Sequence, residues 1–403
     1  MPAGSELGAR ESFFRERFPD FWASSEGHDY ALFDRHRMRE NDVAELRTAC
    51  ADAWHIYRRA FEVLRAMPDD ALRAMGIPET ALRVCRLSYP DVPETVVGRF
   101  DFIRSDDGFK VIEFNAETPF FVWESNRING EIARAFGDRD PNAGCEEALG
   151  HAFARAVSIA APAARRLVIT AYNPYREDYF TAQYVRDVLS RAIPNRRIDF
   201  AALHELHIKD GALHDESGRV DILYRMYPLE HFARDEGGTA LFDLVERGAL
   251  TIINPPSALL LQTKAAQVVI WGLAQAGAFF DDAERRLIAK RFLPTFSDLP
   301  GDGEVYVAKP VLGREGNGVR IVRGAAIIDA AARTDYDDQP RVFQRFVESP
   351  LVAYRDPRLG AQMGHAISTC FVVGGEPGAV GLRVARGTIT DEWAHFLPVS
   401  YAK

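Results

Sequence analysis

Three oxygen-bearing side chains, Glu113, Asn115 and Glu117, alternate with apolar residues in the segment VIEFNAETPFF. A fourth, Asp101, lies in the preceding apolar segment VVGRFDFIR. Carboxylate and carboxamide oxygens are the ligands that Mg²⁺ prefers, so Asp101, Glu113 and Asn115 could together hold a magnesium ion. Whether they meet depends on how the two segments pair.

The segments VVGRFDFIR and FKVIEFN flank SDDG, a pattern typical of an antiparallel hairpin. A three-residue loop DDG, with Gly108 in the left-handed conformation, would place Asp101 opposite Glu113. The same register would place Arg99 opposite Asn115. A two-residue loop would instead put the two carboxylates on opposite faces of the hairpin.

Burial also favours the three-residue loop, because that register gathers one apolar face from Phe100, Phe102, Ile112 and Phe114. Two carboxylates directly opposite one another repel unless a cation lies between them. The register therefore indicates a metal site. The alternative is a hairpin with a hydrated, charged face.

A second candidate site is the segment YVAKPVLGREGNGVRIV, which predicts two strands joined by a glycine-rich loop. No Gly-Lys-Ser/Thr is present and no helix follows the glycines, so neither a P-loop nor a dinucleotide fingerprint is indicated. Such a loop can still fold over phosphates with its backbone N–H groups, while Lys309 supplies a point charge. A glycine-rich hairpin with surface Lys and Arg side chains is the alternative.

The third candidate is Lys264, at the start of an apolar helix expected in LLLQTKAAQVVIWGL. A lysine near a helix start runs against the macrodipole preference, which indicates an anionic partner. The alternative is a surface lysine whose aliphatic stem covers apolar residues.

The elements that must position these residues alternate between helix and strand and predict a mixed α/β (α+β) fold. Helices are expected at residues 42–67, 122–136, 145–160, 178–192 and 257–277. Beyond the hairpin, strands are expected in RRLVITAYNP, IDFAALHEL, DILYRMYPL, LTIINPP, EVYVAKP, GVRIVRG, ISTCFVV and AVGLRVARG. These elements divide the chain into three regions, residues 1–165, 166–255 and 256–403.

Composition limits the functions that this chain can have. Its 403 residues, 47% hydrophobic and 27% charged, are those of a globular protein with a large core. A net charge of −9 without a basic run argues against nucleic acid as a partner. The N-terminal segment lacks an apolar signal region, no run of about 18 apolar residues occurs, and the four cysteines form no CxxC spacing. We therefore expect a cytoplasmic protein without a membrane partner.

Several segments, in one order over roughly residues 95–400, resemble the synthetase domain of the glutathionylspermidine synthetase family of ATP-grasp ligases. These are GRFDF, GFKVIEFNAETP, LYRMYPLE, INPPSALLLQTKAAQVVIW, RFLPTF, VAKPVLGREGNGV, VFQRFV and GEPGAVGLRVARGTITDEWAHFLP. The resemblance implies an ATP-grasp-like fold of the glutathionylspermidine and eukaryotic glutathione synthetase type, with a helical N-terminal segment. Residues 1–165 would then carry the metal-binding hairpin, 166–255 the substrate-binding region, and 256–403 the nucleotide-binding region with its glycine-rich lid.

The resemblance also implies roles for single residues. The magnesium ligands would be Asp101, Glu113 and Asn115, and the catalytic arginines would be Arg99, beside the reacting phosphoryl group, and Arg314, in the mobile glycine loop. The ATP-binding residues would be Lys264, Lys309, Gly313, Gly316, Gln344 and Arg383. Glu230 and Glu117 are candidate substrate-binding carboxylates; for Glu230, the alternative is a glutamate on a surface loop.

The activity that the resemblance implies is ATP-dependent ligation of a carboxylate to an amine through an acyl phosphate, with ATP and Mg²⁺ as cofactors. The substrates would be a small carboxylate and an amine, and the protein would be a monomer or a homodimer. Two alternatives stay open. One is an amino-acid or peptide ligase of a biosynthetic pathway, suggested by the aromatic residues after ETP, and the other is a non-catalytic ATP-binding descendant. No amidase domain is expected.

Overall fold

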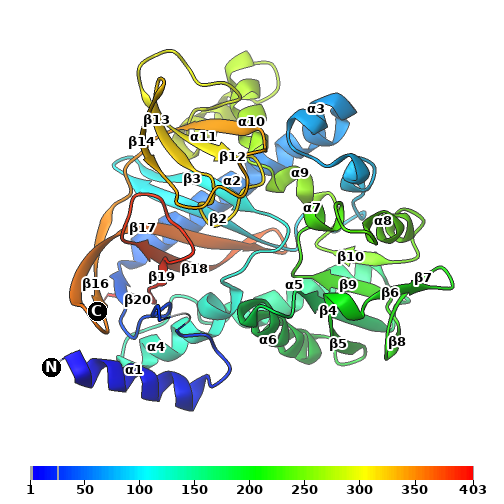
Figure 1. The fold of residues 1–403 in the computed structure, drawn as a ribbon, viewed down its shortest axis with the longest axis horizontal. Coiled ribbons are helices and arrows are strands. Elements are labelled where there is room, and N and C mark those ends of the chain that lie inside the picture. Colours follow the sequence, from blue (N-terminus) through cyan, green and yellow to red (C-terminus); the bar gives the residue numbers. More distant parts are fainter. Residues whose placement is uncertain (1–2, 25–26, 403) are drawn as a thin grey trace.

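Three sheets organise the computed structural model, which describes residues 3–24 and 27–402 (Figure 1). The central sheet is antiparallel in the order β19-β18-β17-β2-β3, with β16 paired to β17. Its strands are β2 (Val97–Ser105), β3 (Gly108–Asn115), β16 (Leu351–Asp356), β17 (Gly360–Val373), β18 (Glu376–Ala385) and β19 (His395–Phe396). The two predicted hairpins, β2–β3 and β17–β18, are confirmed as antiparallel strand pairs and lie in this one sheet.

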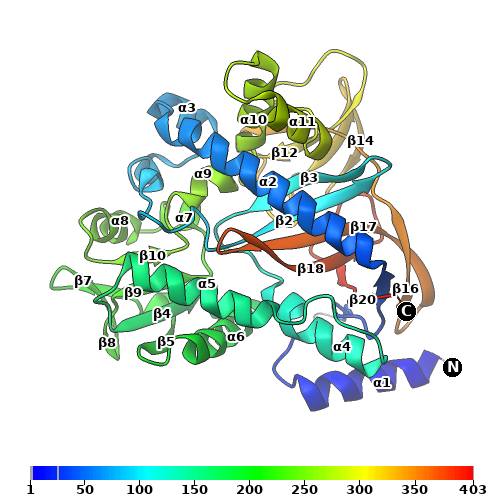
Figure 2. The same ribbon diagram turned by 180° about the vertical axis from the view of Figure 1, so that it is seen from behind.

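The long helix α2 (Glu40–Ala66) crosses the back of the central sheet (Figure 2). The helical apolar spacing that predicted it buries one face against the sheet. The rings of Phe100 and Phe114 stack with centroids 3.9 Å apart. The ring of Tyr57 in α2 packs edge-on against both, with its centroid 5.4 Å from that of Phe100 and 4.9 Å from that of Phe114. This aromatic core fixes the β2–β3 hairpin against α2.

The hairpin has the predicted partners but not the predicted turn. Ser105 pairs with Gly108 across a two-residue loop, so the three-residue loop is wrong. A β-bulge in β3 corrects the register: Asp101 pairs with Glu113 although Phe102 pairs with Val111. The extra residue is Ile112, which has no partner on β2.

The bulge also changes which apolar side chain enters the core. Val111 is fully buried and takes the place that the sequence assigned to Ile112. Ile112 is only half-buried and lies on the side of the functional cavity. The extra residue thus keeps both carboxylates on one face while the apolar face stays continuous.

The second sheet is fully parallel in the order β10-β9-β4-β5, and its strands alternate with helices along the chain as the sequence predicted. Its strands are β4 (Arg166–Ala171), β5 (Arg197–Ala202), β9 (Ile222–Arg225) and β10 (Thr251–Ile253). The helices of this region are α5 (Cys145–Ala160), α6 (Arg176–Ala192), α7 (Leu229–Phe232) and α8 (Gly238–Glu246). A small antiparallel sheet is formed by β6 (His207–Lys209), β7 (Ala212–Asp215) and β8 (Gly218–Arg219).

The third sheet is antiparallel in the order β11-β15-β12-β13-β14 and carries the glycine-rich loop between β12 and β13. Its strands are β11 (Thr295–Phe296), β12 (Val305–Pro310), β13 (Arg320–Arg323), β14 (Ala326–Ala330) and β15 (Arg341–Arg345). The single helix expected at 257–277 is interrupted: α9 (Ala258–Gln262) ends at Thr263, whose ψ of 131° is extended, and α10 (Ala265–Ala276) begins after Lys264. Helix α11 (Asp282–Arg291) follows.

The remaining elements lie in the N-terminal region and at the C-terminus. They are α1 (Ala3–Arg17), β1 (His36–Met38), α3 (Asp69–Ala74), α4 (Asn129–Ala135) and β20 (Val399–Tyr401), together with short 3₁₀ turns and a π-helical turn at Glu124–Ile128. Strand β20 pairs in parallel with β1. No helix among the residues described is long and apolar enough to cross a membrane.

The central sheet takes its strands from both ends of the chain, so it spans the first and third of the predicted regions. The boundaries at 165 and 255 fall just before β4 and just after β10. The three-part division stays a prediction.

We expect Phe114→Ala to lower the free energy of unfolding by about 3–5 kcal/mol, because it removes a stacked ring and leaves a cavity beneath α2. Urea unfolding followed by circular dichroism measures this. The control is Ile327→Ala on β14, where the side chain is 58% exposed and the change should stay within about 0.5 kcal/mol. Equal unfolding midpoints for the two variants would contradict the role given to the aromatic core.

Candidate active site

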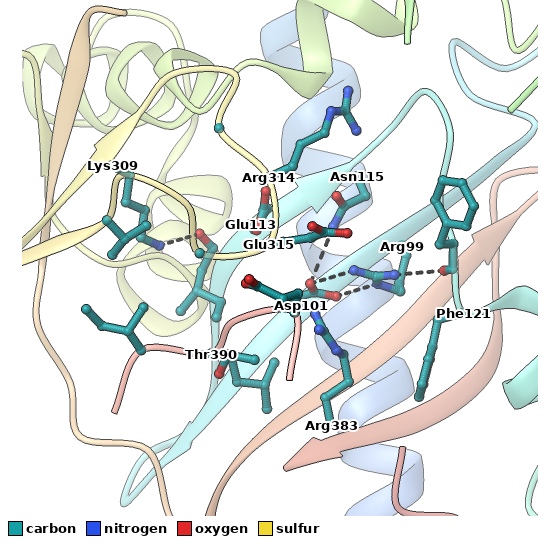
Figure 3. Close-up of a pocket in the computed structure, with 18 of the residues that line it drawn as sticks. Arg99, Asp101, Glu113, Asn115, Phe121, Lys309, Arg314, Glu315, Arg383 and Thr390 are labelled. Carbon is teal, nitrogen blue, oxygen red and sulfur yellow. Dashed lines mark hydrogen bonds and ion pairs between the residues drawn. The ribbon is translucent and has the colours of Figure 1, made fainter. Parts of the chain in front are cut away.

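A cavity of about 1370 Å³ receives side chains from strands of the central and third sheets and from segments that follow strands of the parallel sheet. It brings together eleven of the thirteen residues proposed from the sequence: Arg99, Asp101, Glu113, Asn115, Lys264, Lys309, Gly313, Arg314, Gly316, Gln344 and Arg383. Glu117 and Glu230 are not on its surface. Figure 3 shows the carboxylates of the hairpin facing the glycine loop, with Arg383 approaching from the opposite side.

The carboxylate of Asp101 is held by the guanidinium of Arg99 through two hydrogen bonds. Arg99 Nε donates to Oδ1 at 2.7 Å and Nη2 donates to Oδ2 at 2.9 Å. The remaining Nη1 donates to the backbone carbonyl of Phe120 at 2.7 Å. Burial opposes the charge of Arg99, but Asp101 outweighs it and the pKa of Arg99 is raised. The arginine is therefore fixed in orientation and stays charged.

Lys264 connects the hairpin to the glycine loop. Its Nζ lies 2.7 Å from Glu113 Oε1 and donates to the carbonyl of Gly313 at 2.6 Å. The break between α9 and α10 makes this contact possible, because it places Lys264 at the N-cap of α10. Burial would raise the pKa of Glu113, but Lys264, Lys309 and Arg99 together lower it. Glu113 is therefore an ionised carboxylate.

Lys309, at the end of β12, is anchored by the bulge of the hairpin. Its Nζ donates to the carbonyl of Ile112 at 2.9 Å and to Gln344 Oε1 at 2.7 Å. Burial lowers the pKa of Lys309 to about 8, with Lys264 adding to the shift and Glu113 opposing it. The Gln344 amide donates in turn to Gln267 Oε1 at 2.7 Å. This hydrogen bond holds Gln344 in position to accept from Lys309.

The hairpin fits a hard divalent cation by its donor chemistry. Asp101 and Glu113 are directly paired across the strands, and Asn115 Nδ2 lies 3.4 Å from Asp101 Oδ2. Over residues 3–24 and 27–402, no group of three or more His, Cys, Asp or Glu side chains could hold a metal ion. A site here would therefore need the carboxamide oxygen of Asn115 as a third protein ligand, in an all-oxygen set suited to Mg²⁺.

The two carboxylates outside the cavity surface belong to a buried ionic cluster. Glu117 pairs with Arg225, both fully buried, and Glu230 Oε1 lies 2.6 Å from Arg314 Nη2. Burial raises the pKa of Glu117 to about 7 although Arg225 opposes the shift, whereas Arg314 lowers the pKa of Glu230 to about 2 against its burial. Both glutamates thus hold protein arginines, Glu230 is no surface residue, and substrate binding by them stays a prediction.

The glycine loop meets the segment that follows β18. A Cβ atom on Gly316 would lie 2.3 Å from the carbonyl oxygen of Thr390, so only glycine allows this approach. Arg333 Nη1 also lies 3.8 Å from Glu315 Oε2 in the glycine loop and 3.8 Å from Glu392 Oε1 in the segment after β18. The two segments together cover one side of the cavity (Figure 3).

The sequence analysis missed residues at the carboxyl end of the parallel sheet. Tyr172, Tyr175, Glu177 and Asp178 line the cavity just after β4. Burial, together with Glu124 and Glu315, raises the pKa of Glu177 to about 8, and burial raises that of Asp178 to about 7. Their position could have been inferred, because ligands of open parallel sheets bind beyond the carboxyl ends of the strands.

The architecture is that of the glutathione synthetase-like proteins, an ATP-grasp-like fold. A glutathione synthetase-like effector of Globodera pallida, solved without ligand, superimposes with a TM-score of 0.59 at 12% identity, over 92% of this chain and 89% of that one. Residues 20–401 match the family described as glutathionylspermidine synthase preATP-grasp. The chain belongs to this family. A Haemophilus influenzae protein that carries the provisional name acid–amine ligase is 24% identical over 394 residues, 94% of this chain and 90% of its own length.

We expect Arg225→Met to destabilise the protein by about 3–5 kcal/mol, because Glu117 is then buried without its cation and must either stay an unpaired charge or take up a proton. Adding Glu117→Leu should recover much of the loss, since no uncompensated charge is left. The control is Arg83→Met, which breaks an exposed pair with Glu246 and should cost less than about 1 kcal/mol. Thermal and urea unfolding measure all of these variants. If the double variant is as unstable as Arg225→Met, the charge is not the cause.

Proposed function

We propose that this protein is an ATP-dependent carboxylate–amine ligase that forms an amide bond through an acyl phosphate. Membership of the glutathionylspermidine synthase family and the name of the Haemophilus influenzae relative support a ligase. The observation that carries the proposal is the link made by Lys264, which contacts both Glu113 of the hairpin and Gly313 of the glycine loop. One buried ammonium thus joins the candidate metal ligands to the candidate phosphate loop.

The chemistry follows from the charges around the cavity. A carboxylate oxygen of the acid attacks the γ-phosphorus of ATP, and ADP leaves. The amine nitrogen then attacks the acyl carbon, phosphate leaves, and the nitrogen loses a proton. Lys264 and Lys309 neutralise the phosphates, and Arg99, held by Asp101 and Phe120, stabilises charge on the transferring group.

Asp101, Glu113 and Asn115 would hold a magnesium ion. Bound there, the ion would neutralise charge on the phosphates of the nucleotide. Without a cation, the two carboxylates would repel an incoming triphosphate, although Arg99 and Lys264 partly balance them.

The glycine loop would exclude water from the acyl phosphate. Backbone N–H groups around Gly313 and Gly316 can cover the phosphates, while Arg314 is anchored to Glu230. The contact of the glycine loop with the segment around Thr390 closes the cavity on one side. A closed site favours attack by the amine over hydrolysis.

The test is release of ADP and phosphate from Mg·ATP with panels of acids and amines, with products identified by mass. Asp101→Asn should lower the rate at least about 100-fold, because it weakens the metal site and frees Arg99. The matched control is Asp106→Asn, an exposed aspartate in the turn of the same hairpin, which should keep the wild-type rate. Binding of Mg·ATP without turnover for any acid and amine pair would favour the non-catalytic alternative.

We expect the affinity for Mg·ATP to weaken as the pH rises through about 8, because Lys309 loses its positive charge there. Lys309→Met should weaken binding at pH 7 by roughly 10- to 100-fold, the value of a hydrogen bond to a charged group. It should also remove most of the pH dependence between pH 7 and 9. Isothermal titration calorimetry measures both effects. Lys209→Met, an exposed lysine on β6, is the control and should leave both unchanged.

A further inference from the structure

The side of the cavity next to Arg99 is aromatic. The aromatic residues that line this cavity include Trp22, Tyr30, Phe120 and Phe121. The backbone of Phe120 is directly adjacent to Arg99, because its carbonyl accepts the hydrogen bond from Arg99 Nη1 at 2.7 Å, and Phe120 also lines the cavity. An acid whose carboxylate approaches Arg99 therefore places the group beside that carboxylate against these rings.

The backbone holds this aromatic wall in a fixed position. Phe121 has a φ of 77°, a conformation that a bulky side chain adopts only when its surroundings impose it. Its ring is buried edge-on against Phe396, with centroids 5.2 Å apart. Gly381 leaves room for it, since a Cβ there would lie 2.4 Å from Phe121 Cε1. Figure 3 shows Phe121 on the same side of the cavity as Arg99 and Arg383.

A second aromatic layer supports the wall from behind. Trp123 stacks on Tyr184 with centroids 5.7 Å apart and packs edge-on against Trp22 at 5.8 Å. Two residues of the cavity lining, Trp22 and Thr118, carry a polar atom, Trp22 Nε1 and Thr118 Oγ1, that is buried without a hydrogen-bond partner among the described residues. Both can donate to acceptor atoms of a ligand, which satisfies groups that are costly to leave unpaired.

We infer that the acid substrate carries an aromatic or branched apolar group beside its carboxylate, together with a hydrogen-bond acceptor such as an amide carbonyl. This inference rests on the proposed function and specifies its acyl donor. A small acid such as N-acetylglycine would leave the aromatic wall exposed to water, whereas an apolar group of the right size would cover it. The structure thus favours acyl donors larger and more apolar than a terminal glycine.

Hydroxylamine can replace the unidentified amine substrate, so the preference for the acid can be measured without knowing that amine. The carboxylate attacks the γ-phosphorus and ADP leaves; the nitrogen of hydroxylamine then attacks the acyl carbon and phosphate leaves, which gives a hydroxamate. The intact protein with Mg·ATP and hydroxylamine would be given N-acetylphenylalanine, N-acetylleucine and phenylacetate in one set, and N-acetylglycine, acetate and glutathione in the other. We expect kcat/KM to be roughly 10- to 100-fold higher for the best acid of the first set.

A matched pair of variants tests whether the aromatic wall causes the preference for the acid. Phe120→Ala should reduce the preference for N-acetylphenylalanine over N-acetylglycine by about 10-fold or more, while Mg·ATP binding shows that the fold is intact. Phe279→Ala, a half-buried phenylalanine that does not line the cavity, should keep the wild-type preference. Hydroxamate formed equally well or better from the acids of the second set would overturn this inference and leave the proposed ligase function standing. No hydroxamate from any acid would overturn both.

Discussion

The pairing of Asp101 with Glu113 is the constraint on which the site depends. Two carboxylates on adjacent strands of one hairpin repel one another in a buried setting, so the fold must bring cations to them. It does so with one cation from the hairpin itself and two from distant parts of the chain. Arg99 comes from the same strand, Lys264 from the N-cap of α10, and Lys309 from the end of β12. The cations that balance the hairpin are also the groups suited to bind a triphosphate, so stability of the apo site and affinity for an anionic ligand have one physical origin.

The bulge at Ile112 connects packing to this electrostatic arrangement. A regular two-residue hairpin would have turned one carboxylate into the aromatic core beneath α2. The extra residue restores the pairing, leaves Ile112 outside the ladder, and presents its carbonyl to Lys309. A local irregularity of the backbone therefore keeps the core apolar, aligns the carboxylates and positions a lysine. Bulges near active sites commonly redirect side chains in this way.

The cavity has a charged side and an aromatic side, and Arg99 lies at their boundary. Its guanidinium faces Asp101 in one direction and the Phe120 carbonyl in the other. The buried cluster of Glu117, Arg225, Glu230 and Arg314 lies behind the glycine loop and anchors it to the parallel sheet. In this arrangement the charged side carries the groups proposed to bind phosphate, and the aromatic side is the part of the cavity from which we infer the preference for the acid.

The sequence by itself determined the α/β alternation, helix α2 and both hairpins, and eleven of the thirteen residues that it proposed for the site line the cavity, because periodicity and turn residues act locally and the motifs occur in one order. Tertiary structure alone decided the two-residue turn and its compensating bulge, the break at Thr263 that turns Lys264 toward Glu113, and the pairing of Glu117 and Glu230 with arginines. For Lys264, Glu117 and Glu230 the partner lies far away along the chain, and the balance between burial and charge is set only when distant segments pack together.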